Sequence, residues 1–107
     1  MAGKIYPNVS LLNKKNIHLA NGVKLKSGVV VDAESGPVII DKNTEVMPNS
    51  VIIGPVYIGK NCLIKTGAKI YPGTTIGQVS KIGGEIEATI IHEYSNKQHG
   101  GFLGHSY

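Results

Sequence analysis

The feature that most constrains the fold of this chain is a run of aliphatic residues that recurs at intervals of six. The spacing is unbroken through Ile40, Val46, Ile52, Ile58, Ile64, Ile70, Ile76 and Ile82. A period of six fits neither the 3.6-residue turn of an α-helix nor the heptad of a coiled coil, but it is a multiple of the two-residue strand period. All eight side chains can therefore point inward, and we predict an all-β fold.

A second set of aliphatic residues with the same spacing precedes the first. Its members are Ile5, Leu11, Ile17, Val23 and Val29. The two sets are out of phase across residues 29–40, where Asp32, Ala33, Glu34, Ser35, Gly36 and Pro37 form a turn-rich stretch. We predict a loop or irregular corner there.

The remaining positions of each six-residue unit indicate a short strand followed by a corner. The position four residues after each anchor is small or medium-sized in most units, as a narrow interior requires, and the members are Thr44, Ser50, Val56, Cys62, Ala68, Thr74, Ser80 and Ile86. The position before it holds residues suited to turns, namely Asn43, Asn49, Pro55, Asn61, Gly67 and Gly73. Three units per turn predict a triangular parallel β-helix of roughly four to five coils, stacked at the interstrand spacing of about 4.8 Å.

We expect residues 1–107 to form a single β-helix domain within a longer chain. The expected subdivision is first coils over residues 1–34, an irregular corner over 35–39, regular units over 40–87, and a polar loop with an incomplete coil over 88–107. The spacing alone does not set the hand of the coil.

Composition and charge exclude several classes of binding partner. The net charge is +4, yet the 11 lysines are scattered along the sequence without arginine or interleaved aromatic residues, so we expect no nucleic-acid partner. No apolar stretch approaches a spanning length, so we expect no membrane partner and a cytoplasmic location. The one cysteine, Cys62, falls at a small core position, which indicates a buried, inert thiol.

Candidate chemistry lies in the last part of the chain, where polar residues replace the regular anchors. Three histidines, His92, His99 and His105, occur there close to Glu85, Glu87 and Glu93. Their intervals of seven and six differ from the close ligand pairs of short zinc motifs, so we predict no metal site, although a zinc ion shared between subunits of a β-helix carbonic anhydrase stays open. General base catalysis needs only one imidazole, and His105 is the candidate.

The unit Ile58-Gly59-Lys60-Asn61-Cys62-Leu63 resembles the hexapeptide-repeat transferases, a family of left-handed β-helices that usually form homotrimers. The repeats up to Ile82, with Gly104-His105-Ser106-Tyr107, are similar to the acetyltransferase domain of bifunctional N-acetylglucosamine-1-phosphate uridyltransferases and related sugar-phosphate nucleotidyltransferases. This resemblance implies acetyl transfer from acetyl-CoA to an amino-sugar 1-phosphate. It also implies that the hand is left and that the assembly is a trimer.

By the same resemblance, His105 would be the general base and Tyr107 would contact the sugar phosphate, with Lys97 as a second substrate-binding residue. Only Ser106 separates His105 from Tyr107, where the family commonly has two residues. Acetyl-CoA would be a co-substrate of the full-length protein and no cofactor would be tightly bound, while residues 1–107 alone would be inactive. The alternative is a non-catalytic oligomerisation or regulatory module of a sugar nucleotidyltransferase. Separately, Tyr57, Tyr71 and Pro72 fall at turn or outward positions, where they could pack against a neighbouring subunit or form ordinary surface.

Overall fold

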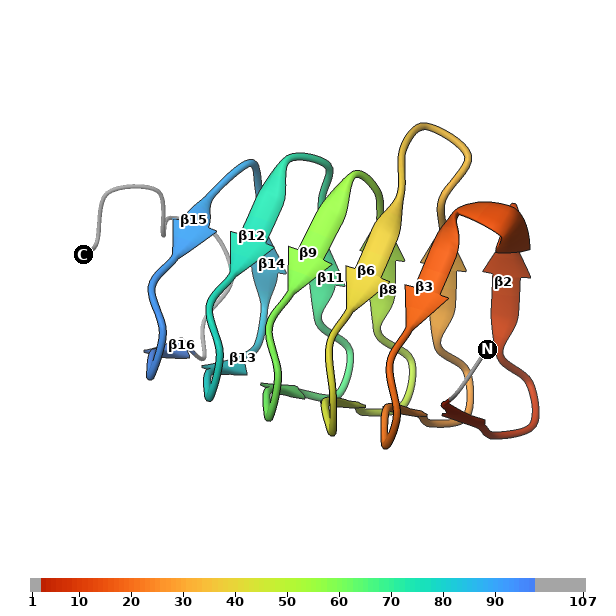
Figure 1. Cartoon of the computed structure of the whole chain (residues 1–107), viewed down its shortest axis with the longest axis horizontal. Coiled ribbons are helices and arrows are strands. Elements are labelled where there is room, and N and C mark those ends of the chain that lie inside the picture. Colours follow the sequence, from red (N-terminus) through yellow and green to blue (C-terminus); the bar gives the residue numbers. More distant parts are fainter. Residues whose placement is uncertain (1–2, 98–107) are drawn as a thin grey trace.

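The computed structural model describes residues 3–97, which form a parallel β-helix with three sheets along its sides (Figure 1). Sheet A contains β1 (Lys4–Ile5), β4 (Lys24–Leu25), β7 (Glu45–Val46), β10 (Leu63–Ile64), β13 (Lys81–Ile82) and β16 (Asn96–Lys97). Sheet B contains β2 (Ser10–Leu12), β5 (Val30–Asp32), β8 (Val51–Ile53), β11 (Lys69–Ile70) and β14 (Glu85–Ile86). Sheet C contains β3 (Ile17–Leu19), β6 (Val38–Ile40), β9 (Val56–Ile58), β12 (Thr74–Ile76) and β15 (Ile90–Ile91).

Each strand pairs in parallel with its counterpart one coil further along the chain. In Figure 1 the strands of sheet C run downward in front and β2 of sheet B runs upward behind, while the chain advances from right to left. The coil is therefore left-handed. The predicted fold class is confirmed, with about five turns, and residues 3–97 contain no helix beyond one 3₁₀ turn, η1 (Lys14–Asn16).

The interior of the coil is a set of aliphatic stacks, because the register aligns one anchor from each coil. In sheet A the stack runs through Ile5, Leu25, Val46, Ile64 and Ile82. All eight predicted anchors from Ile40 to Ile82 have no exposed surface. The eight small or medium-sized positions between them are buried as well, which confirms the pattern predicted for the second half of the chain.

Ile5 and Leu11 are anchors as predicted, but the chain departs from the predicted phase between Ile17 and Val29. Leu19, Leu25 and Val31 lie opposite Ile40, Val46 and Ile52 and are therefore the anchors there, whereas Ile17, Val23 and Val29 occupy the position two residues earlier. The phase changes first at η1, ahead of the slip that the sequence predicted, because η1 lengthens the corner between β2 and β3. The connection between β5 and β6, residues 33–37, is longer than the later connections between sheets B and C, but Val38 and Ile39 of the corner predicted at 35–39 belong to β6.

Coil length shrinks towards the end of the described chain, as the sheet A register shows. Successive partners are Lys4 and Lys24, Lys24 and Glu45, Glu45 and Leu63, Leu63 and Lys81, and Lys81 and Asn96. The first two coils are thus longer than three regular units, the next two match three units, and the last is shorter. β15 and β16 lie in the segment after residue 87, for which the sequence predicted a loop and an incomplete coil, and Ile91 is 1% exposed. The coil therefore continues through this segment with shorter corners.

Buried hydroxyl and thiol groups in the core donate hydrogen bonds to backbone carbonyls of the next coil. Thr44 Oγ1 donates to Gly59 O at 2.7 Å, and Ser50 Oγ donates to Lys65 O at 2.8 Å. Cys62 Sγ lies 3.1 Å from Gly77 O. A buried polar group costs little when it is paired in this way, so these residues fit the narrow interior.

No helix in the described part of the chain has the length and hydropathy needed to span a membrane.

Candidate functional site

The outer face of sheet C carries a column of partly apolar side chains. The register places His18, Ile39, Tyr57, Thr75 and Ile90 side by side, one from each coil. Each of these five residues has an inward-facing residue on either side in the sequence. Because side chains alternate between the two faces of a strand, each of the five points outward. The exposed fractions of Ile39, Tyr57 and Ile90 are 39%, 38% and 61%. Exposed large apolar side chains in contiguous positions mark a binding or packing surface.

Two shallow cavities lie along this column and meet at Ile39. The larger has a volume of about 430 Å³ and is lined by Ile17, His18, Leu19, Ala20, Ile39, Ile40 and Asp41. The smaller, about 250 Å³, is lined by Pro37, Ile39, Pro55, Val56, Tyr57, Gly73, Thr74 and Thr75. We name these two neighbouring cavities together the sheet C groove; their lining is mostly apolar and includes the imidazole of His18 and the carboxylate of Asp41.

Asp41 supplies the carboxylate of the sheet C groove, and two hydrogen bonds hold that carboxylate in place. Its Oδ1 accepts a 2.8 Å hydrogen bond from the backbone N–H of Lys42, and its Oδ2 accepts a 3.0 Å bond from the Tyr57 hydroxyl. These two bonds, aided by the charges of Lys60 and Lys42, lower the pKa of Asp41 from that of an ordinary aspartate. At neutral pH Asp41 is therefore an oriented carboxylate that can accept a hydrogen bond from a ligand amine or hydroxyl.

Tyr57 stays protonated beside this carboxylate. Burial raises the pKa of Tyr57 from that of an ordinary tyrosine, and the hydrogen bond to Asp41 raises it further. Tyr57 therefore acts as a hydrogen-bond donor that positions Asp41 and not as a base near neutral pH.

Cys62 is not a candidate nucleophile. It is 3% exposed in the core, and burial raises the pKa of its thiol. The thiolate is the reactive form, so a raised pKa makes this cysteine unreactive, in agreement with the inert thiol that the sequence predicted.

The site residues that the sequence selected lie at the end of the chain, with His105 as the catalytic residue and Tyr107 and Lys97 as substrate-binding residues. His105 and Tyr107 fall outside the described residues. Lys97 is the last residue of β16, and its Cα lies opposite that of Ile82 in β13. Within residues 3–97 no group of three or more His, Cys, Asp and Glu side chains is arranged to hold a metal ion.

The sequence did not single out His18 and Asp41. They are distant in the sequence and share one cavity because the coil between β3 and β6 is longer than three regular units, pairing Ile17 with Val38. That extra length is absorbed in the connection before β6 and cannot be placed from spacing alone. The aromatic Tyr57 was the one visible signal, since it occupies an outward position in a regular unit.

Comparison with known proteins agrees with the repeat architecture. Residues 37–72 match the model of the bacterial transferase hexapeptide family, described as six repeats. The chain is 35% identical over 101 residues to the bifunctional protein GlmU of Acidithiobacillus ferrooxidans, an alignment that covers 92% of this chain and 20% of that protein. It is 36% identical over 62 residues to a 2,3,4,5-tetrahydropyridine-2,6-dicarboxylate N-succinyltransferase of Methylobacillus flagellatus, covering 58% of this chain and 22% of that enzyme. The chain thus spans about a fifth of the length of the curated relatives it matches.

Proposed function

Because this chain is a hexapeptide-repeat protein of the bacterial transferase type, we propose that it is the β-helix part of a sugar-phosphate N-acetyltransferase. The reaction is transfer of the acetyl group of acetyl-CoA to the amine of an amino-sugar 1-phosphate. The observation that carries this proposal is the 35% identity to a bifunctional GlmU along 92% of the chain. Catalysis belongs to a protein longer than residues 1–107, and we expect these residues alone to be inactive.

His105 serves as the general base in this proposal. Its imidazole takes a proton from the sugar amine as the amine nitrogen attacks the thioester carbonyl. The tetrahedral intermediate then collapses, the carbon–sulfur bond breaks and coenzyme A leaves as the thiolate. An imidazole suits this step because its pKa lies near neutrality.

Tyr107 and Lys97 bind the acceptor in this proposal. The Tyr107 hydroxyl can donate a hydrogen bond to a phosphate oxygen, and the Lys97 ammonium can neutralise phosphate charge. Lys97 belongs to the final described strand of sheet A. Acetyl-CoA is a co-substrate, and no tightly bound cofactor is required.

The test is the His105→Ala variant of the full-length protein. The acetylation rate should fall by roughly a hundredfold or more, the scale that general base catalysis supplies. Binding of acetyl-CoA, measured by calorimetry on the same variant, should stay within about twofold, because the imidazole acts on the acceptor amine. An unchanged acetylation rate would rule out His105 as the base.

Lys97 has a matched control in Lys14, an exposed lysine of η1 at a distant corner. Lys97→Ala in the full-length protein should raise KM for the sugar phosphate, while Lys14→Ala should leave it unchanged. Equal effects of the two variants would contradict a binding role for Lys97.

A second candidate function is supported by the apolar column on sheet C. A non-catalytic oligomerisation module would use Ile39, Tyr57 and Ile90 to pack against copies of itself. Both roles allow the chain to form an oligomer, so the oligomeric state does not separate them. Binding of acetyl-CoA to the full-length protein does, because a purely structural module would not bind it. Saturable binding that competes with coenzyme A therefore favours the transferase.

A further inference from the structure

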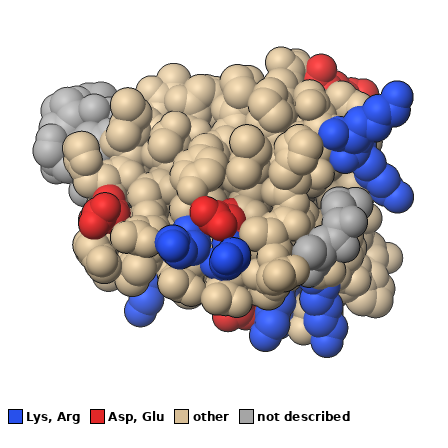
Figure 2. All heavy atoms as spheres, in the orientation of Figure 1, with Lys and Arg blue, Asp and Glu red and all other residues tan. Residues whose placement is uncertain are grey.

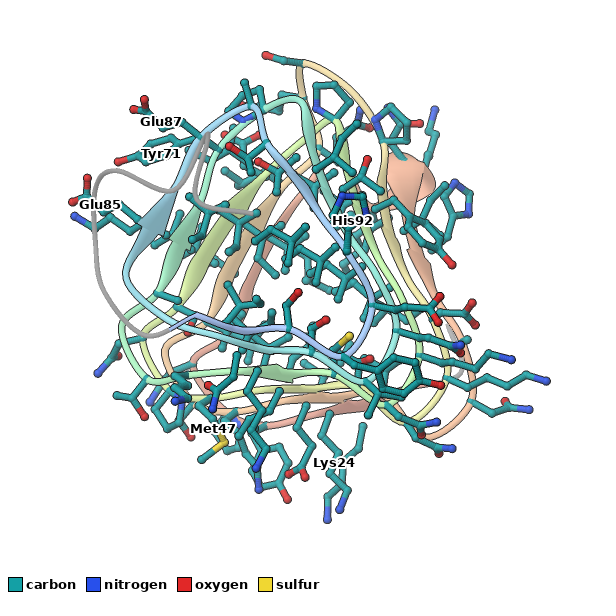
Figure 3. All side chains as sticks on the ribbon, turned by 90° about the vertical axis from the view of Figure 1, so that its left-hand side faces the viewer. Lys24, Met47, Tyr71, Glu85, Glu87 and His92 are labelled. Atoms are coloured by element: carbon teal, nitrogen blue, oxygen red, sulfur yellow. The ribbon has the colours of Figure 1, made fainter. Side chains whose placement is uncertain are left out.

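The coil gathers lysines that are scattered in the sequence onto one face. Every coil returns the chain to sheet A, so residues one coil apart in the sequence become neighbours across the sheet. The outward positions of this sheet hold Lys4, Lys24, Lys26, Lys65 and Lys81, against the single carboxylate of Glu45. Figure 3 shows Lys24 and Met47 projecting outward from this side of the coil, and Figure 2 shows lysine side chains along the corresponding lower edge.

The net charge of the chain is therefore unevenly distributed. The sheet A face carries five lysines and one glutamate, a net +4. Lys42, Lys60 and Asp41 add +1 at the corner before it. The remaining charged residues up to position 96 sum to −2, and they are Lys14, Lys15, Lys69, Asp32, Glu34, Glu85, Glu87 and Glu93. The sheet A face is basic, while the other charged residues up to position 96, that corner included, sum to −1.

The charge is densest around Tyr6. The Lys26 ammonium lies 4.5 Å from the centre of the Tyr6 ring and 3.3 Å from its hydroxyl oxygen, and the Lys4 ammonium lies 5.0 Å from the ring centre. Lys24 is the direct neighbour of Lys4 across the sheet. We name Lys4, Tyr6, Lys24 and Lys26 the Tyr6 cluster.

The three ammonium groups of the Tyr6 cluster are poorly compensated. Glu45, whose Oε2 lies 4.0 Å from Lys26 Nζ, is the one acidic partner within ion-pair distance among the residues that the structure describes. Strands of adjacent coils are about 4.8 Å apart, well inside the screening length of about 8 Å at physiological salt, so the positive potentials add. The lowered pKa of the Tyr6 phenol, caused first by the Lys26 hydrogen bond and then by the charges of Lys26, Lys4 and Lys24, is consistent with this potential.

We propose that the outer face of sheet A binds a soluble oligophosphate, with the Tyr6 cluster as the centre of the site. Several adjoining ammonium groups suit a compact ligand that carries two or more phosphate charges. The site is separate from the sheet C groove and does not depend on the proposed acetyl transfer.

Other polyanions fit the face less well. Base stacking needs a free aromatic surface, and the one aromatic residue of the cluster already has two ammonium groups against its ring. A lipid surface is held best when apolar side chains insert beside the charges. The large apolar side chains at the outward positions of sheet A, Leu63 and Met47, are half-buried, unlike the exposed Ile39 and Ile90 of sheet C.

The test is calorimetric titration with inorganic triphosphate at low ionic strength, where screening is weak. The wild-type chain should bind saturably. The Lys24→Gln/Lys26→Gln variant should bind at least about tenfold more weakly, the scale of one lost charge-assisted hydrogen bond. The control Lys14→Gln/Lys15→Gln makes the same charge change at η1, away from the face, and should bind within about twofold of wild type.

A second readout locates the ligand at the cluster. Triphosphate places negative charge beside Tyr6, so the pKa of its phenol should rise when the ligand binds, as seen in the ultraviolet titration difference between the wild type and Tyr6→Phe. Absence of saturable binding, equal loss in the two double variants, or tighter binding of oligothymidylate than of triphosphate would each overturn the proposal.

Discussion

At the scale of single residues, the corners between sheets C and A show how the coil turns. The residues with positive φ at this corner are Gly22 (80°), Asn43 (61°), Asn61 (56°), Val79 (56°) and Tyr94 (62°). Glycine and asparagine adopt this left-handed conformation readily. Val79 is the β-branched member, and it holds the conformation because the coils on both sides fix the corner through the bonds Val79 N–H to Lys60 O and Tyr94 N–H to Gln78 O.

We expect Val79→Asn to stabilise the fold by roughly 1 kcal/mol, since a branched side chain is strained at positive φ and asparagine is not. Val79 is 42% exposed, so little burial is lost. Thermal unfolding should show a midpoint raised by a few degrees.

Val30→Asn is the matched control, because Val30 lies in the extended strand β5. It should give no gain, as asparagine is disfavoured in strands. If the thermal unfolding midpoint of Val79→Asn were lower than that of the wild type, Val79 would not be strained at this corner.

At the scale of elements, strands of two or three residues are stable only as stacks. Ile64 of β10 lies between Val46 and Ile82 with no exposed surface. Each coil contributes three such anchors, so neighbouring coils supply the burial that a single coil lacks.

Ile64→Ala should destabilise the chain by about 2 to 5 kcal/mol, because it leaves a cavity between two coils that backbone pairing holds in place. Urea unfolding measures the change. Lys69→Ala is the control: Lys69 also lies in a two-residue strand, β11, but is exposed, and its loss should cost within about 0.5 kcal/mol. Similar losses for the two variants would show that the stacks do not dominate stability.

At the scale of the whole molecule, the three faces differ in character. Sheet A is basic, sheet C carries the apolar column, and the exposed fractions of Ile39 and Tyr57 leave that column open to a partner. A small solenoid gains most from covering such a face with a copy of itself.

If the chain forms the proposed homotrimer through sheet C, its molar mass by light scattering should be about three times the 11.4 kDa of one chain. Ile39→Lys should shift the mass towards one chain, since it buries a charge in the contact. Leu12→Lys is the control on sheet B, as Leu12 and Ile39 are both 39% exposed. If Leu12→Lys dissociates the oligomer and Ile39→Lys does not, the contact between subunits lies on sheet B and not on sheet C.

The sequence by itself determined the architecture. An inward residue every six positions, small residues two positions before the next anchor, and Asn or Gly at the corners are local requirements of a narrow triangular coil, and each unit satisfies them independently. For that reason the interior from Ile40 to Ile82 was predicted residue by residue, and the core position of Cys62 with it. The anchors from Ile17 to Val29 were predicted with the wrong phase, because a corner lengthened by η1 shifts the anchors without interrupting the aliphatic spacing, whereas Ile5 and Leu11 before it were predicted correctly.

Only the tertiary structure decided which residues share a face. His18 and Asp41 share a cavity, and Lys4 and Lys26 flank Tyr6, because the lengthened first coils set a register between strands that the regular period does not fix. Register depends on how each corner absorbs its extra residues and on which backbone groups then pair. The outward side chains carry no packing constraint that would reveal this in the sequence. The aliphatic repeat thus specifies the coil, while the unequal lengths of its turns specify the surfaces on which function is proposed.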